Sequence, residues 1–128
     1  MERNWEHFEH GPVEMQSERI HVTINPRGSL FLNQRAIEAL GEPDFVVLMY
    51  DRRRSTIGVS PAPSSRQNAF RLKRKERKRN GGRVLYASNF CRFYAISPEE
   101  TLAFTAAEVD KNGVLVLDLN EVKSVRKL

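Results

Sequence analysis

The sequence predicts a small, mainly β domain with short helices, an α+β fold built from two copies of one unit. Three observations indicate this: apolar residues fall in short runs between turn residues, residues 27–60 return in degenerate form at 82–117, and 128 residues suffice for one core but not for two. A unit this short cannot bury its own apolar face. We therefore expect the two copies to bury their apolar faces against each other.

The repeat is defined by order, spacing and turn chemistry, because identities between the two copies are few. When Gly28 is aligned with Gly82, the apolar positions coincide after two short insertions in the second copy. The matched sets are Leu30, Phe31 and Leu32 with Val84, Leu85 and Tyr86; Ala36, Ile37 and Leu40 with Phe90, Cys91 and Tyr94; Val47 and Met49 with Leu102 and Phe104; and Ile57 and Val59 with Val114 and Val116. We expect most of these residues in the core, including Met49, Val114 and Val116.

The first unit spans residues 20–60. Its expected elements, in order, are a strand at 20–24, a turn at 25–28, a strand at 29–32, a short helix between Asn33 and Gly41, a strand at 45–50, a hairpin tip at 51–55 and a strand at 56–60. Residues 20–24 alternate apolar and polar, which is typical of a half-buried strand. Asn33 is a good N-cap and Gly41 a good helix terminator. Residues 45–50 are apolar throughout, which predicts a strand covered on both faces.

A linker at 61–81 and a second unit at 82–118 follow. Proline and serine interrupt strand pairing at 60–65, and Phe70 and Leu72 favour a short edge strand beyond them. The second unit is expected to contain a strand at 82–86, a helix at about 88–94, a strand at 101–105, a hairpin turn at 110–113 and a strand at 114–119. The Asn-Gly pair in that turn accepts the positive φ that hairpins demand. Residues 1–18 are expected to be an acidic tail, and residues 121–128 a tail or helical turn.

Composition narrows the class of protein. Hydrophobic residues make up 40% and charged residues 29% of the chain, which is ordinary for a soluble domain. The longest apolar run, 45–50, is too short to cross a bilayer, and the N-terminus has no apolar signal core, so we expect a cytoplasmic location. The single cysteine, Cys91, excludes an internal disulfide and is expected to be a small buried hydrophobe. We expect no metal site and no cofactor, because the pair His7 and His10 has no third ligand.

Positive charge is concentrated in one segment. The formal net charge is +5, and residues 66–83 hold nine Lys or Arg against one Glu. The rest of the chain is therefore slightly acidic, with five Glu within residues 1–18. Such asymmetry commonly marks an anionic partner. A solvated linker kept soluble by its charge is the alternative interpretation.

The run from Arg27 through the Ser-Leu-Phe-Leu strand and the short helix to Leu40 and Gly41 resembles the signature of AbrB-, SpoVT- and MraZ-type proteins. The second unit is similar at the Gly82-Arg83 turn and at Arg92. The resemblance covers about residues 20–60 and 82–118. It implies a pseudo-twofold swapped-hairpin β-barrel in which two units interlock, both supplied by one chain as in MraZ-type proteins.

The resemblance also implies DNA binding through basic residues near the turn and on the short helix. Ser29 stands where the turn arginine of the first unit belongs, and Asn33 and Ala87 replace the usual proline. Basic residues at 71–79 would follow a phosphate backbone without reading its sequence. The candidate nucleic-acid contacts are Arg27, Arg35, Arg71, Lys73, Arg74, Lys75, Arg77, Lys78, Arg79, Arg83 and Arg92.

Two functions remain open at this point. The first is a DNA-binding protein, a transcription regulator of the AbrB/MraZ kind. The second is a protein-interaction or assembly module on the same fold, with a homo-oligomer or another protein as its partner. We expect no enzyme, because the sequence has no nucleophile–base set, paired-carboxylate site or phosphate-binding glycine loop.

Overall fold

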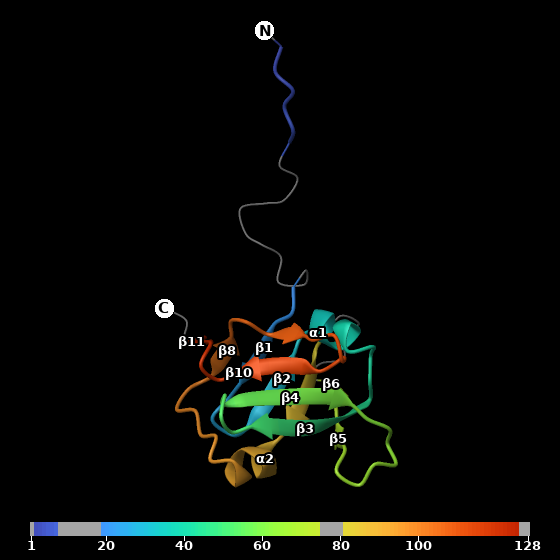
Figure 1. Ribbon diagram of the computed structural model, residues 1–128, viewed down its shortest axis with the longest axis vertical. Helices are drawn as coiled ribbons and strands as arrows, with labels where there is room; N and C mark the ends of the chain where they lie inside the picture. The colour runs from blue at the N-terminus through green and yellow to red at the C-terminus, as the bar shows by residue number, and fades with distance from the viewer. Residues whose placement is uncertain (1, 8–18, 75–80, 126–128) are drawn as a thin grey trace.

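The computed structural model describes residues 2–7, 19–74 and 81–125. Residues 19–125 form a mainly β fold with two short helices (Figure 1). The elements in chain order are β1 (Val22–Ile24), β2 (Ser29–Leu32), α1 (Gln34–Ala39), β3 (Phe45–Asp51), β4 (Thr56–Pro61), β5 (Phe70–Arg71), β6 (Lys73–Arg74), β7 (Arg83–Tyr86), α2 (Ser88–Phe93), β8 (Leu102–Phe104), β9 (Glu108–Val109), β10 (Leu115–Asp118) and β11 (Val122–Ser124). The predicted fold class, mainly β with short helices, is confirmed.

The strands form two antiparallel sheets rather than one closed ring. A six-stranded sheet has the order β11-β8-β1-β2-β7-β6, and a five-stranded sheet has the order β5-β3-β4-β10-β9. In Figure 1 the five-stranded sheet lies in front of the other, and α1 and α2 lie at opposite ends. Each sheet contains strands from both halves of the chain.

Strands at matching positions in the two halves pair with each other. β2 pairs with β7 so that Leu30 lies opposite Leu85, and β4 pairs with β10 so that Val59 lies opposite Leu115. A further pair crosses between the halves, because β8 pairs with β1, whereas β3 pairs with β5 of the linker. Neither half of the chain therefore completes a sheet by itself.

One hydrophobic core joins the two halves. Its fully buried large side chains are Val22, Ile24, Leu30, Leu32, Ile37, Val46, Ile57, Val59, Leu85, Leu115 and Leu117. The expectation of a single core fed by both units is confirmed. Cys91 is also buried in it, and burial raises the pKa of its thiol, as expected for a cysteine that acts as a small hydrophobe.

The inward-facing residues of β10 are one position later than predicted. Leu115 and Leu117 are fully buried, whereas Val114 and Val116 are half-buried. The turn sets this phase: the Asp110 backbone N–H donates to the Val114 carbonyl at 2.8 Å, so Val114 closes the hairpin instead of entering the core. Met49 was likewise expected inside but is 43% exposed, because Tyr50 lies opposite the buried Ile57 and alternate residues point away. An uninterrupted apolar run does not show which alternate set faces the core.

The linker and the C-terminus contain three short strands. The edge strand expected near Phe70 is present as β5. The next strand in the chain, β6, pairs with β7. Leu72, between them, is buried, and its backbone N–H donates to the Asp44 carbonyl at 2.9 Å. Residues 122–124, expected as tail or helical turn, form β11 because β8 offers an open edge to their backbone.

Candidate nucleic-acid interface

The predicted basic residues fall into two groups and one separate position. Lys75, Arg77, Lys78 and Arg79 lie outside the described residues. Arg71, Lys73, Arg74 and Arg83 line one groove, Arg27 and Arg92 line a second hollow, and Arg35 lies on α1 away from both.

The first group lines what we call the basic groove. It is a depression of about 730 Å³ at the corner where β5, β6 and β7 meet, and its lining residues are Asp44, Phe45, Arg71, Leu72, Lys73, Arg74 and Arg83. Four of these side chains are cationic and one is acidic, which gives a formal net charge of +3. The groove is therefore the strongest concentration of positive charge that these strands present.

Buried Leu72 organises the basic groove. Its side chain enters the core while β5 joins the five-stranded sheet and β6 joins the six-stranded sheet. The chain thus bridges the two sheets at this residue. Arg71, Lys73 and Arg74 are all exposed as a result, so their charges face solvent on either side of an anchored residue.

Arg83 has a more fixed position than the other three cations. It is half-buried, and its Nη1 donates to the Gly81 carbonyl at 3.0 Å. In the β6–β7 pair it lies opposite Arg74, and the neighbouring Lys73 has its Nζ 5.3 Å from the ring centroid of Tyr86. Two of the groove's cations are therefore held by specific contacts, and pre-positioned cations lose less freedom on binding an anion.

The second group lines the turn–helix hollow, which we define by Pro26, Arg27, Gly28, Ser88, Cys91, Arg92, Ala95, Ile96 and Ser97. Its volume is about 340 Å³. The turn of the first unit lies against the start of α2, since the Ala87 backbone N–H donates to the Gly28 carbonyl at 3.0 Å. Arg27 and Arg92, which come from different units, thereby meet at one site.

Arg35 stands apart from both groups. It is exposed on α1, and its Nη1 lies 3.8 Å from the Oε2 of Glu38, one turn along the same helix. Such exposed pairs contribute little to stability, but the carboxylate offsets the arginine's charge. Arg35 lines neither the basic groove nor the hollow that contains Arg27 and Arg92.

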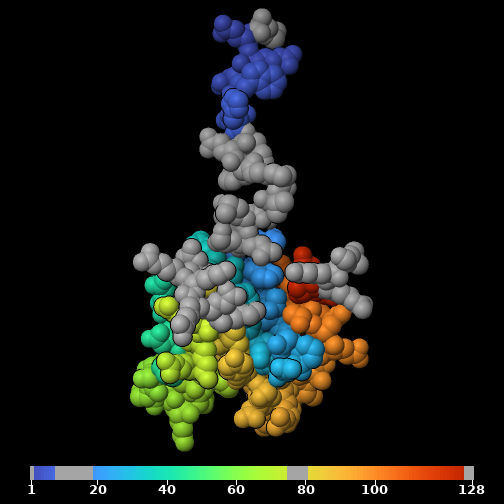
Figure 2. All heavy atoms as spheres, turned by 180° about the vertical axis from the view of Figure 1, so that it is seen from behind, coloured from blue at the N-terminus to red at the C-terminus, as the bar shows by residue number. Residues whose placement is uncertain are grey.

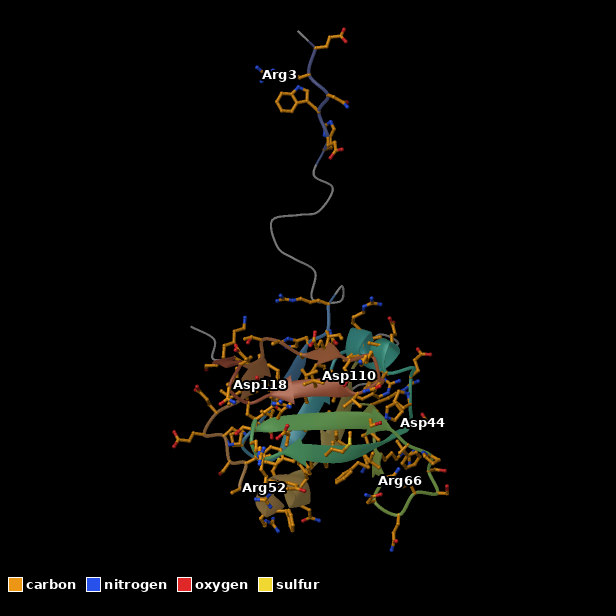
Figure 3. The ribbon with its side chains drawn as sticks, viewed as in Figure 1. Arg3, Asp44, Arg52, Arg66, Asp110 and Asp118 are labelled. Atoms are coloured by element: carbon orange, nitrogen blue, oxygen red, sulfur yellow. The ribbon has the colours of Figure 1, made fainter. Side chains whose placement is uncertain are left out.

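The three arginines of the β3–β4 tip do not extend the basic groove. Arg52 lies over the ring of Tyr94 at 5.0 Å, which places the tip beside α2 (Figure 3). Asp44, which lines the groove, precedes β3, whereas Arg52 follows it. Seven extended residues separate the two by roughly 25 Å. The structure therefore puts the tip, with Arg52, Arg53 and Arg54, at the end of β3 that lies far from the basic groove.

Two aromatic features were missed from the sequence. Tyr86 is 59% exposed next to the groove, and Phe93 is 72% exposed at the end of α2. The signal for Tyr86 was present, because strand alternation turns it outward once its neighbour Leu85 is assigned to the core. No such alternation identifies Phe93, which packs on Tyr94 with ring centroids 4.8 Å apart.

Among residues 2–7, 19–74 and 81–125, no group of three His, Cys, Asp or Glu is placed to hold a metal ion. Within the same residues, no helix has the length and apolar character to cross a membrane. Comparison with protein-family models, with curated proteins and with solved structures found no match to this chain.

Proposed function

We propose that this protein binds duplex DNA through the basic groove, as a cytoplasmic transcription regulator with the interlocked two-unit arrangement of AbrB- and MraZ-type proteins. The observation that carries the proposal is the convergence of Arg71, Lys73, Arg74 and Arg83 on one groove with a single carboxylate. Cations gathered on one face are the electrostatic footprint of a nucleic-acid partner.

The chemistry of the groove suits a phosphate backbone better than a small anion. Arg71, Lys73 and Arg74 are exposed and follow one another along an extended chain, so they present charge along a line. Each phosphate that such a side chain neutralises releases condensed counterions, which favours binding at low salt. Arg83, fixed by its bond to the Gly81 carbonyl, supplies a cation of defined position beside that line.

The strand pairing supports the interlocked arrangement. The β3–β4 hairpin of the first unit lies between β5 and β10, and β8 of the second unit pairs with β1 of the first. An exchange of this kind is what two swapped hairpins would produce. It also explains why one core serves both units.

The proposal is tested by fluorescence anisotropy with a labelled 20-base-pair duplex of random sequence. The variant Arg71→Gln/Lys73→Gln/Arg74→Gln removes three groove charges without altering a buried residue. We expect its affinity to fall at least tenfold at 50 mM salt, and the slope of log K against log salt to flatten by roughly 2.7, or 0.9 per lost contact.

The matched control is Arg52→Gln/Arg53→Gln/Arg54→Gln, which removes the same charge from the other end of β3. We expect the control to stay within about threefold of the parent. Equal losses in the two variants would mean that overall charge, and not the groove, governs binding. An unchanged affinity in the groove variant would reject the proposal.

A protein-interaction module is the second candidate, and the exposure of Phe93 favours it. Its ring is 72% exposed and offers apolar area that a protein partner would bury. If the parent protein does not bind the duplex at 50 mM salt, this second function replaces the first.

A further inference from the structure

The outer face of the six-stranded sheet carries a row of residues of which only Lys73 also lines the basic groove. Leu30, Leu32 and Leu85 face the core, so the residues between and beyond them on β2 and β7 face outward. One row of directly opposite residues crosses four strands, and its members are Thr23, Phe31, Val84 and Lys73. Figure 2 shows this side of the molecule, with blue atoms of the β1 region beside yellow atoms of the β7 region.

Tyr86 is the most accessible aromatic side chain on this face. It is 59% exposed, and in the β2–β7 pair it lies opposite Ser29, a small residue that leaves its ring uncovered on that side. The Nζ of Lys73 lies over the ring, 5.3 Å from its centroid, which restrains the ring and places a cation over one of its faces.

Phe31 is the second aromatic residue of the face, and its ring position is fixed by Gly82. A β-carbon added at Gly82 would meet the Cε2 and Cζ of Phe31 at 2.6 Å. The ring therefore occupies the space that any other residue at position 82 would need. Phe31 is half-buried in this arrangement, so it lines the face without standing out from it.

A hollow lies between these residues and the first turn. Its volume is about 480 Å³, and its lining includes Thr23, Asn25, Arg27, Ser29, Phe31 and Tyr86. Sites for small organic groups have volumes of this order. The hollow thus has an aromatic wall, hydroxyl and amide groups, and the cation Arg27 at its rim.

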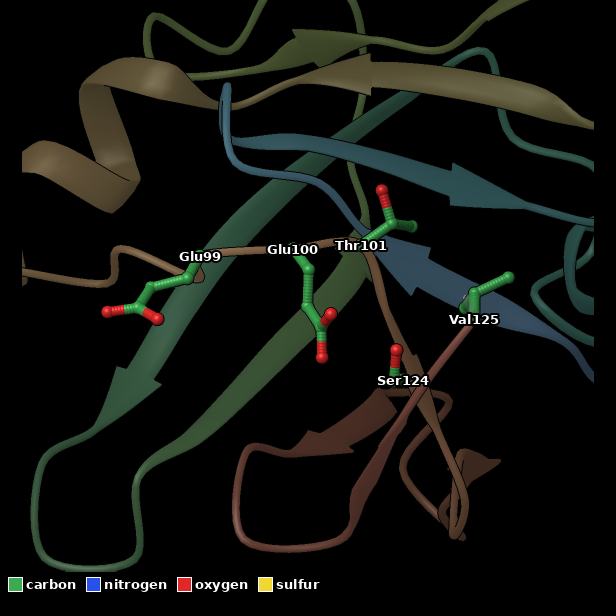
Figure 4. A pocket seen from close by; sticks show the side chains of 5 residues that line it. All are labelled: Glu99, Glu100, Thr101, Ser124 and Val125. Carbon is green, nitrogen blue, oxygen red and sulfur yellow. The ribbon is translucent and has the colours of Figure 1, made fainter. Parts of the chain in front are cut away.

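Acidic residues limit the hollow on its remaining side. Thr101 lines both this hollow and a neighbouring depression that contains Glu99 and Glu100 (Figure 4). A phosphate there would meet two carboxylates, whereas Arg27 and Lys73 attract phosphates at the other margins. The charges therefore favour a polyanion that crosses β2 and β7 and stays away from Thr101.

We propose that this face binds an unpaired segment of nucleic acid, with a base stacked on Tyr86 and the flanking phosphates held by Arg27 and Lys73. Stacking on an exposed ring needs a free base face, which a duplex does not offer. This function differs from duplex binding in the basic groove, because Tyr86, Phe31 and the hollow take no part in that groove. Lys73 is the one cation that the two proposed sites share.

The test compares two fluorescein-labelled 12-mers by anisotropy: oligo-dT and an abasic strand with the same number of phosphates. We expect the parent to bind oligo-dT at least fivefold more tightly than the abasic strand. The Tyr86→Ala variant should lose about 5- to 100-fold of its affinity for oligo-dT and little of that for the abasic strand, because one base stack is removed. Tyr86→Phe, which keeps the ring, should stay within twofold of the parent.

Phe93→Ala is the matched control, since Phe93 is also an exposed aromatic residue but lies on α2. Its affinity for oligo-dT should be unchanged. Equal binding of the two strands by the parent, or an unaltered affinity in Tyr86→Ala, would overturn the inference. So would an equal loss in Phe93→Ala.

Two further measurements keep the test decisive. A thermal melt of each variant shows that lost binding is not lost folding, and Tyr86→Gln offers a second ringless variant if the alanine variant unfolds. The 20-base-pair duplex is titrated in parallel, and Tyr86→Ala should bind it within about twofold of the parent. Failure with oligo-dT alone rejects the single-strand site, whereas failure with the duplex alone rejects the proposed groove function.

Discussion

The turns of the two units place their arginines differently. In the first unit Arg27 is exposed, and the adjacent Gly28 carbonyl accepts the Ala87 backbone N–H at the start of α2. In the second unit Arg83 is half-buried and donates to the Gly81 carbonyl. One turn arginine therefore faces solvent and the other is folded back on its own backbone.

The helix arginines show the reverse pattern: the arginine of the first helix is paired with a carboxylate, and that of the second lines a hollow. In α1, Arg35 is paired with Glu38, and Asn33 caps the first turn by accepting the Ala36 backbone N–H at 3.0 Å. In α2 the N-cap is Ala87, which has no side-chain cap, and Arg92 lines the turn–helix hollow together with Arg27. Residues 20–60 and 82–118 thus expose different arginines, Arg27 in the first segment and Arg92 in the second.

The largest expected effect comes from Gly82→Ala, a substitution in the turn of the second unit. A β-carbon at Gly82 would collide with the Leu32 carbonyl oxygen and with the ring of Phe31. Because the first obstacle is backbone, Gly82→Ala must separate β2 from β7. We expect the free energy of unfolding to fall by about 3 kcal/mol, measured by urea denaturation.

Gly113→Ala is the control for this substitution. Gly113 has a φ of 79° and no atom within 4 Å of an added β-carbon, so alanine there suffers backbone strain alone. That strain costs about 1 kcal/mol. If Gly82→Ala is no more damaging than Gly113→Ala, the close approach of the two units at Gly82 is not a constraint on the fold.

The second-largest expected effect concerns the N-caps of the two helices, because Asn33 caps α1 with its side chain and Ala87 gives α2 no side-chain cap. The Asn33 side chain accepts the backbone N–H groups of Ala36 and His21 and donates its own amide to the Arg19 carbonyl at 2.8 Å. Asn33→Ala should therefore lower the free energy of unfolding by about 1–2 kcal/mol. Ser88→Ala, at the exposed start of α2, should change it by less than about 0.5 kcal/mol. Similar values for the two would remove the distinction between the helices.

The smallest effect concerns pH at the cap of the first unit. Burial, followed by the nearby charges of Arg19 and Lys123, lowers the pKa of His21. Its pKa in the folded protein is thus below that of the unfolded chain, which takes up the proton first as pH falls below about 6.5. Stability from this group is complete above that pH and decreases as pH falls through the window down to the lower folded pKa.

Thermal melts between pH 7.5 and 5 measure this dependence. We expect His21→Gln to flatten it and Lys123→Gln to reduce it, whereas Lys111→Gln, on the exposed β9–β10 turn, leaves it unchanged. An upward shift of the His21 resonance midpoint in an NMR titration would contradict the assignment.

The sequence predicted the backbone plan better than the surface. Turn residues and the apolar pattern were sufficient for the mainly β fold class, the capped helix at Asn33 and the single core. They were insufficient for the phase of β10, because an apolar run such as 114–117 looks the same in either phase. The grouping of the arginines depends on which strands meet, and β5, β6 and β11 are too short to show a period of their own.

The salt dependence of duplex binding by the parent protein tests the central claim most directly. If the four cations of the basic groove each neutralise a phosphate, log K against log salt has a slope of about −3.6, and further contacts make it steeper. We expect a slope of about −3.6 or steeper between 50 and 250 mM salt. A slope shallower than about −2, or no binding at 50 mM, would contradict the assignment of the basic groove as a DNA-binding site.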